Sequence, residues 1–162
     1  MLGLAAQWLG VTQTQANSVA PILISEEQGR HKSTFCRMLM PPQLARYYSD
    51  NLKLTAQGNP ERLLAEMGLL NMDEFDKFGA QKMPLLKNLM QMSSLNICKA
   101  YQKNFRSLPR IASFIGTSNR TDLLCDPTGS RRFICIEAEH DIDCTGIEHS
   151  QIYAQLKEEL LA

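Results

Sequence analysis

Short apolar runs that alternate with helical segments restrict the fold of this chain more than any other feature. Residues 18–24 (SVAPILI), 68–72 (GLLNM) and 111–115 (IASFI) are apolar runs of strand length, and 132–136 (RFICI) is a fourth candidate strand. Such runs are typical of strands that are buried on both faces of a sheet. Strands alternating with helices predict an α/β fold with a mostly parallel sheet flanked by helices.

Helices are expected in the intervals around these strands. The predicted helices are an amphipathic opening helix with Leu2, Ala5, Trp8 and Leu9 on one side, then 33–40, 59–66, 84–92 and 147–161. Two further segments are less regular. Residues 43–47 form a helix or lead directly into a strand at 46–49, and 97–101 pairs with 105–108 in a basic hairpin.

Length and charge limit the function classes. A chain of 162 residues suits a single domain, and regular structure at both ends suggests one cut from a longer multidomain protein. The 17 Lys and Arg residues balance 17 Asp and Glu residues, so the net charge is zero. This balance argues against coating by nucleic acid through bulk attraction, but it permits a local basic channel.

Cysteine usage and hydropathy point to a cytoplasmic protein. Five scattered cysteines without a C-x-x-C pair, together with only three histidines, disfavour a zinc site and suit a reducing compartment. No segment qualifies as a transmembrane helix, so no membrane partner is expected.

The strongest candidate site is the polar loop after the first apolar run. Residues 25–34 (SEEQGRHKST) offer a Lys for phosphate charge and a hydroxyl for Mg²⁺. The phosphate-loop pattern G-x-x-x-x-G-K-[ST] is incomplete, because Glu26 and His31 occupy its two glycine positions. Gly29 can supply part of the missing flexibility, and His tolerates a positive φ better than most residues, so the loop can still form. A polar loop that caps a core helix is the alternative. The predicted nucleotide contacts are Gly29, Arg30, His31, Lys32, Ser33 and Thr34, with Ser33 also on Mg²⁺.

Two acids follow the second apolar run, about 40 residues downstream. In P-loop ATPases an acid at such a strand end holds Mg²⁺, and the next Glu polarises the attacking water. Asp73 and Glu74 are therefore the candidates for these two roles. Alone, this pattern is also typical of a strand that meets a solvated turn. Together with Lys32 and Ser33, its order and spacing favour an ATPase core.

Two later segments complete the candidate site. Asn119, in the run GTSNR after the third strand, can orient water near a γ-phosphate, although a Ser/Asn turn is the alternative. Arg131 and Arg132 follow a turn predicted at 126–129 (DPTG), and one of them could reach the γ-phosphate in cis or across a subunit boundary.

These segments resemble the virulence-associated protein E family. The likeness rests on ISEEQGRHKST, NMDEFDKF and PRIASFIGTSNRTDLLCDPTGSRRF, and it covers roughly residues 18–136. That family comprises bacterial, phage and mobile-element proteins that are akin to superfamily 3 helicases and often joined to primase-type domains. The resemblance implies a P-loop NTPase core of the ASCE/AAA+ kind over residues 1–162.

The resemblance also implies residue roles. Lys32 and Ser33 would contact phosphate and Mg²⁺, with Asp73 and Glu74 as the strand-end acids. Asn119 would be the sensor, and Arg131 or Arg132 the arginine finger. In superfamily 3 helicases a basic hairpin between the acids and the sensor reaches DNA. The residues in that interval here are Lys99, Tyr101, Lys103 and Arg106.

The expected function is that of a Mg²⁺-dependent, ATP-hydrolysing core of a helicase-like DNA replication protein from a phage or mobile element. An arginine supplied by a neighbour would require a homo-oligomer. One alternative is a degenerate module that binds nucleotide without hydrolysing it, motivated by the two missing glycines. Another is a DNA-binding module in which residues 99–110 act without nucleotide, which the neutral net charge disfavours.

Overall fold

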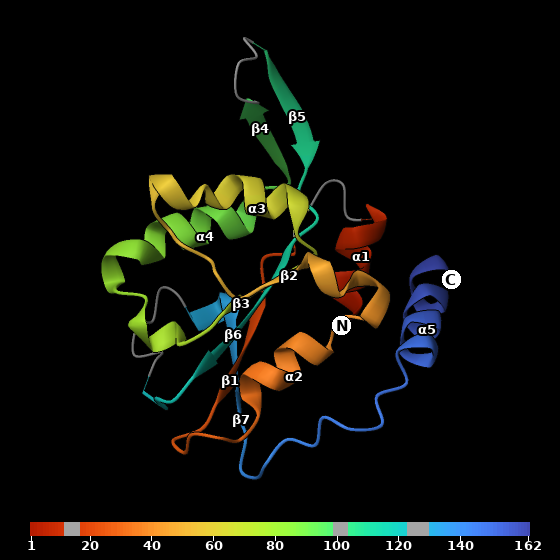
Figure 1. Cartoon of the computed structure of the whole chain (residues 1–162). Coiled ribbons are helices and arrows are strands. Elements are labelled where there is room, and N and C mark those ends of the chain that lie inside the picture. The colour runs from red at the N-terminus through yellow and green to blue at the C-terminus, as the bar shows by residue number, and fades with distance from the viewer. Residues whose placement is uncertain (12–16, 99–103, 123–129) are drawn as a thin grey trace.

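A five-stranded parallel sheet forms the centre of the computed structural model (Figure 1), which describes residues 1–11, 17–98, 104–122 and 130–162. The strand order is β2-β3-β6-β1-β7, and every neighbouring pair is parallel. In that order the strands span Tyr48–Ser49, Leu69–Met72, Ser113–Ser118, Ala20–Ile24 and Phe133–Glu137. The structure thus confirms the α/β fold with a mostly parallel sheet.

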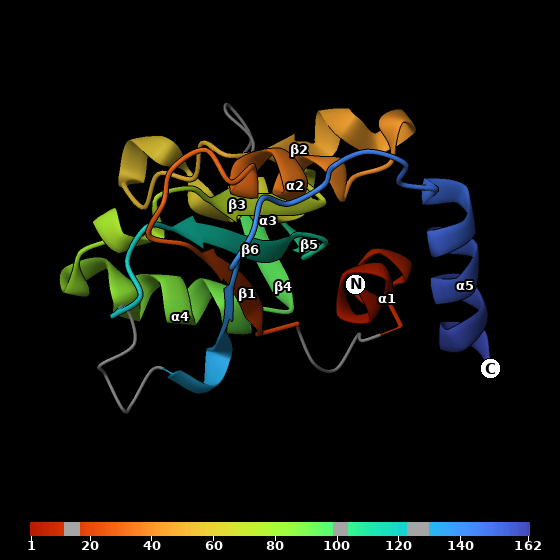
Figure 2. The ribbon, with the colours of Figure 1, turned by 90° about the horizontal axis from the view of Figure 1, so that it is seen from below.

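Helices cover both faces of the sheet, as Figure 2 shows. They are α1 (Leu2–Leu9), α2 (Lys32–Met38), α3 (Pro60–Glu66) and α4 (Met83–Gln91). The last helix, α5 (His149–Leu161), lies beside α1 rather than on the sheet. Leu70 and Met72 of β3 join the apolar cluster under α3 and α4, whereas Leu69 joins the cluster under α1 and α2. Because successive side chains of a strand point to opposite faces, burial on both sides requires the continuous apolar runs seen in the sequence.

Two segments differ from the predicted elements or are left open by the sequence. Residues Pro42–Tyr47 form a 3₁₀ helix that runs directly into β2, so both open interpretations of this region hold in part. Strand β6 continues to Ser118, three residues beyond the predicted end. The turn predicted at 126–129 lies outside the described residues.

The opening helix forms where it was expected, but its buried face differs from the prediction. Leu2 and Leu9 are exposed, while Leu4 and Gln7 are buried. Gln7 is accommodated because its amide donates to the carbonyl of Arg110 at 2.5 Å and accepts from the backbone N–H of Asn17 at 2.9 Å. A polar side chain with both functions satisfied can occupy a core position that hydropathy assigns to an apolar residue.

An antiparallel hairpin projects from the amino-terminal end of the sheet strands (Figure 1). It consists of β4 (Ser94–Cys98) and β5 (Phe105–Pro109), and β5 leads into the start of β6. This confirms a hairpin with its second arm at 105–108, whereas the first arm begins at Ser94, three residues earlier than predicted, and residues 99–101 lie outside the described residues. Within the described ranges no helix is long and apolar enough to cross a bilayer.

The last helix is tied to the first two. Trp8 of α1 and Tyr153 of α5 stack with ring centroids 5.6 Å apart. The Tyr153 hydroxyl donates to the carbonyl of Leu39 at 2.7 Å, and His149 Nε2 lies 2.6 Å from the carbonyl oxygen of Met38. Both carbonyls lie at the end of α2, so α5 holds that end of the helix in place.

Arg110 is a buried cation that joins the hairpin to the domain. It is 1% exposed, and its guanidinium donates to the backbone carbonyls of Asn17, Met90, Met92 and Ala112 at 2.6–3.2 Å. Burial lowers the pKa of Arg110 to about 10, so the group remains charged at neutral pH. Four carbonyl dipoles therefore replace the water that a buried guanidinium loses.

Replacing Arg110 with Met is expected to lower the free energy of unfolding by about 3 kcal/mol or more, because four carbonyl groups lose their donor. Urea denaturation measures this loss. Arg62→Met is the matched control: its ion pair with Glu66, at 2.7 Å, is exposed, so the expected loss is below about 1 kcal/mol. Equal small losses in both variants would contradict the anchoring role of Arg110.

Candidate functional site

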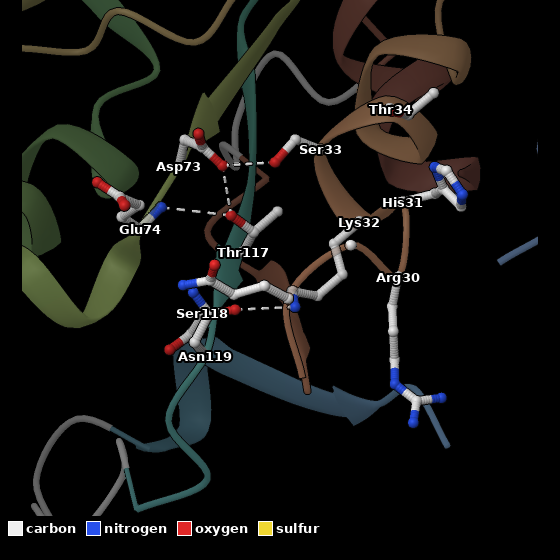
Figure 3. Close-up of a pocket in the computed structure, with 12 residues that line it drawn as sticks. Arg30, His31, Lys32, Ser33, Thr34, Asp73, Glu74, Thr117, Ser118 and Asn119 are labelled. Atoms are coloured by element: carbon white, nitrogen blue, oxygen red, sulfur yellow. Dashed lines mark hydrogen bonds between the residues drawn. The ribbon is translucent and has the colours of Figure 1, made fainter. Parts of the chain in front are cut away.

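A polar cleft of about 410 Å³ opens at the carboxyl ends of β1, β3 and β6. It brings together the loop before α2, the two acids after β3 and the end of β6 (Figure 3). The lining residues are Gln28, Gly29, Arg30, His31, Lys32, Ser33, Thr34, Asp73, Glu74, Thr117, Ser118 and Asn119. Most of the residues singled out from the sequence thus meet in one place.

The loop before α2 adopts the unusual backbone that its sequence requires. Gly29 has φ 84°, and His31 has φ 58° and ψ 22°, directly before the first residue of α2. His31 thus adopts the positive φ that histidine tolerates, and its carbonyl accepts the N–H of Phe35 at 2.8 Å. Glu26 is exposed and does not line the cleft, so its carboxylate is directed away from it.

Lys32 places a nearly buried ammonium in the cleft. It is 8% exposed, and Nζ lies within 3.4 Å of four oxygens: two of Ser25, the carbonyl of Glu27 and Oδ1 of Asn119. Burial chiefly lowers the pKa of Lys32; Arg30 adds to this effect and Asp73 opposes it. Among the described residues no carboxylate forms an ion pair with Lys32. The ammonium is therefore held by neutral oxygens, which an anionic ligand can replace.

Asp73 connects three elements through one carboxylate oxygen. Its Oδ1 accepts the hydroxyl of Ser33 at 2.7 Å and the hydroxyl of Thr117 at 2.6 Å. Thr117 in turn accepts the backbone N–H of Glu74 at 3.3 Å. The structure therefore brings the predicted metal residues Ser33 and Asp73 into contact across 40 residues of sequence.

Glu74 lines the cleft, but its carboxylate is paired. Oε2 accepts Lys77 Nζ at 2.6 Å, and both side chains are at least half exposed. The left-handed backbone of Glu74 (φ 52°) begins the 3₁₀ turn Phe75–Lys77 that carries this lysine. The acid pair after the second apolar run indicates Glu74 in the sequence, but nothing in that pattern indicates its pairing with Lys77.

Four residues of the site are not among those predicted from the sequence: Gln28 and Ser25 in and before the loop, and Thr117 and Ser118 on β6. Thr117 and Ser118 belonged to the GTSNR run, yet only Asn119 was selected from it. Their signal was a row of hydroxyl residues at the end of an apolar strand. Ser25 had the same signal at the end of β1. Ser118 donates to Asp76 at 3.0 Å, which fixes the end of β6 against the turn after β3.

The structure does not bring Arg131 and Arg132 to the cleft. They lie in a 3₁₀ turn directly before β7, whose first residue, Phe133, pairs with Ala20 at the start of β1. The cleft lies at the other end of these five-residue strands, roughly 16 Å away at the usual rise per residue. Arg106 lies exposed on β5 of the hairpin, and Lys99, Tyr101 and Lys103 lie outside the described residues.

Fold and cleft together define an α/β protein with a cationic and acidic site at the carboxyl edge of a parallel sheet. The sequence matches the virulence-associated protein E-like domain over residues 11–160, and the chain belongs to that family. This confirms the resemblance. Comparison with curated proteins finds no match.

Solved structures of the NrS-1 C-terminal region share the fold. Two apo structures of this region match with TM-scores of 0.57 and 0.56 and 21% sequence identity, and each match covers 98% of this chain. A further apo structure, in the A form, matches with a TM-score of 0.55. The chain spans 37–39% of these structures, so it corresponds to one part of them.

Thr117→Val is expected to lower the free energy of unfolding by about 2 kcal/mol, because Asp73 loses a buried donor and the N–H of Glu74 loses its acceptor. Chemical denaturation measures the change. Thr145→Val is the matched control, since Thr145 also donates to a carboxylate, that of Asp143 at 2.7 Å, but is exposed. An equal effect of the two substitutions would contradict a structural role for the Asp73 contacts.

Proposed function

We propose that the chain is the Mg²⁺-dependent, nucleotide-hydrolysing core of a helicase-like replication protein of a phage or mobile element. One observation carries this proposal: Lys32, Ser33, Asp73 and Asn119, from three separate segments, surround one cleft through direct contacts. An ammonium, a hydroxyl and a carboxylate in this arrangement suit a triphosphate and its metal ion.

The strand order supports the ASCE/AAA+-like interpretation of the fold. Strand β6 lies between β1, which leads into the phosphate loop, and β3, which leads into the acids. Thr117 and Asn119 at the end of β6 therefore lie between the loop and the acids. A water molecule that attacks a terminal phosphate would occupy this intermediate position.

Each residue has a role that follows from its chemistry. Lys32 neutralises charge on the phosphates, and Asn119, already 3.0 Å from Lys32 Nζ, orients the attacking water. Ser33 and Asp73 would hold Mg²⁺, which when bound neutralises the β- and γ-phosphate oxygens. No group of three or more His, Cys, Asp or Glu side chains that could hold a metal occurs in the described parts of the chain. This donor set fits Mg²⁺, which usually binds one or two carboxylates together with substrate phosphates.

Glu74 is assigned to activate water. Its Oε2 is paired with Lys77 in the structure, so separation of the pair would free this oxygen to accept a proton from water. Exposed ion pairs of this kind are weak, so ligand binding can break them.

DNA is the proposed macromolecular partner, contacted through the hairpin. Phe105 is 71% exposed and Arg106 is exposed beside it on β5. An aromatic ring and a guanidinium on a projecting hairpin suit base stacking and phosphate contact with single-stranded DNA. Lys99, Tyr101 and Lys103 remain part of this proposed surface.

Lys32→Ala is expected to abolish calorimetrically measured Mg-ATP binding and to lower kcat/KM for ATP hydrolysis by about 100-fold or more. Asp73→Asn should remove the Mg²⁺ dependence of binding, because the carboxylate is the charged metal ligand. Lys157→Ala, on the exposed face of α5, is the control and should bind normally.

Two outcomes would change the proposed function. Unchanged Mg-ATP binding in Lys32→Ala would rule out the cleft as the nucleotide site. Lys32-dependent binding without hydrolysis in an assembled protein would assign the chain to the non-hydrolysing alternative.

The arginines must act in trans if they act on nucleotide, because they lie at the opposite end of the sheet. A mixture of Lys32→Ala chains and Arg131→Ala/Arg132→Ala chains should regain hydrolysis, since mixed oligomers restore intact sites. Lys32→Ala mixed with Asp73→Asn should regain none, because every cleft is then defective. Absence of recovery in the first mixture would exclude an intersubunit role for these arginines.

A further inference from the structure

A second pocket lies on the other side of the acid pair. It has a volume of about 370 Å³ and shares Asp73 and Glu74 with the first cleft. Its remaining polar wall carries three lysines, Lys53, Lys77 and Lys82. Two cavities thus share one acidic wall, and the second is lined by cations that the sequence analysis did not consider.

The three lysines come from separate segments. Lys53 lies in the loop after β2, Lys77 ends the 3₁₀ turn Phe75–Lys77, and Lys82 ends the 3₁₀ turn Ala80–Lys82. All three are exposed at the rim, while Leu52 and Leu54 are buried beneath them. The convergence of independent segments on a single pocket with an apolar floor distinguishes it from a run of solvated lysines along one helix.

The charge balance of the pocket is positive. Among the described residues, neither Lys53 nor Lys82 forms an ion pair with a carboxylate. Lys77 is the only one of the three with such a partner in that part of the chain, and it neutralises Glu74. The remaining acid, Asp73, already accepts two hydroxyl hydrogen bonds from the opposite side. With three ammonium groups and two carboxylates in its wall, the pocket offers an incoming anion a net charge of +1.

We propose that this pocket binds a phosphate group, and that the bound phosphate draws Lys77 away from Glu74. The phosphate is either free inorganic phosphate or a backbone phosphate of single-stranded DNA. Binding is independent of the proposed function, whereas the regulatory consequence rests on it. Once Lys77 turns to the phosphate, Glu74 is released in the wall of the nucleotide cleft, where it can accept a proton from water.

The energetic basis is a competition for one ammonium. In the ligand-free structure Lys77 donates to a single, half-exposed carboxylate, and such a pair is weak because water screens it. A phosphate in the pocket offers several charged oxygens to all three lysines at once. Lys77 is therefore a positioning residue for Glu74, and the phosphate determines which of two partners it takes.

Binding is tested by NMR on the isotope-labelled 162-residue chain carrying Lys32→Ala, which removes the main phosphate ligand of the first cleft. Sodium phosphate and a short oligothymidylate are titrated separately at constant ionic strength. We expect saturable shifts of the Lys53, Lys77 and Lys82 amide signals. Adding Lys53→Gln and Lys82→Gln should weaken the binding by about tenfold or more, whereas adding Lys157→Gln should leave it unchanged.

Each outcome has a defined meaning. If sodium phosphate saturates the shifts at a concentration equal to or below that of the oligothymidylate, the pocket is a free-anion site. If the oligothymidylate binds more tightly, the pocket is a DNA contact. Both results support the proposal. Absence of saturable shifts with either probe overturns it, as do shifts that the Lys53→Gln/Lys82→Gln variant retains in full.

The regulatory step is tested by steady-state hydrolysis with Lys32 intact. Lys77→Gln should raise kcat with little change in KM for Mg-ATP and should remove any stimulation by the probe that binds. An unchanged or lowered kcat overturns the control of Glu74 by Lys77. If unsubstituted protein hydrolyses no nucleotide, the proposed function fails, while the NMR titration still decides whether the pocket binds phosphate.

Discussion

One carboxylate oxygen of Asp73 organises the carboxyl edge of the sheet. It accepts the hydroxyl of Ser33 from α2 and the hydroxyl of Thr117 from β6, while its own backbone extends from β3. Three elements that are distant in sequence are thereby fixed relative to one another. The position of Lys32 follows from this arrangement, because it is the residue before Ser33 and its ammonium reaches Asn119, two residues beyond Thr117.

A buried cation lies at each end of the sheet, and the two cations are held differently. At the amino end, the guanidinium of Arg110 is buried and donates to four carbonyls at 2.6–3.2 Å. At the carboxyl end, Lys32 is also buried among neutral oxygens, but at the longer distances of 3.0–3.4 Å, and it lines the cleft. A closely bonded buried cation stabilises the fold, whereas one that is loosely held beside a cleft can exchange those oxygens for a ligand.

Local sequence patterns predicted most of the fold, but they did not predict contacts between segments that are distant in sequence. The apolar runs identified β1 and β3, and the Asn59–Pro60 signal located the start of α3. The loop sequence is also compatible with the positive φ of His31. In contrast, the burial of Gln7 depends on Arg110, 103 residues away, and the pairing of Glu74 with Lys77 depends on a short turn that has no hydrophobic period. Arg131 and Arg132 lie at the far end because they precede β7, which runs parallel to β1, and the spacing of the motifs alone does not show this.

The attachment of α2 at both of its ends has a consequence for how the chain acquires its fold. Just before the helix, Arg30 donates to the carbonyl of Glu139. At its other end, the carbonyls of Met38 and Leu39 contact His149 and Tyr153. These partners lie 109–114 residues later in the sequence. Contacts of such long sequence separation form late, since the intervening chain must first be ordered. During synthesis on the ribosome, the helix after the loop therefore acquires its final restraints only after residues 139–153 have emerged.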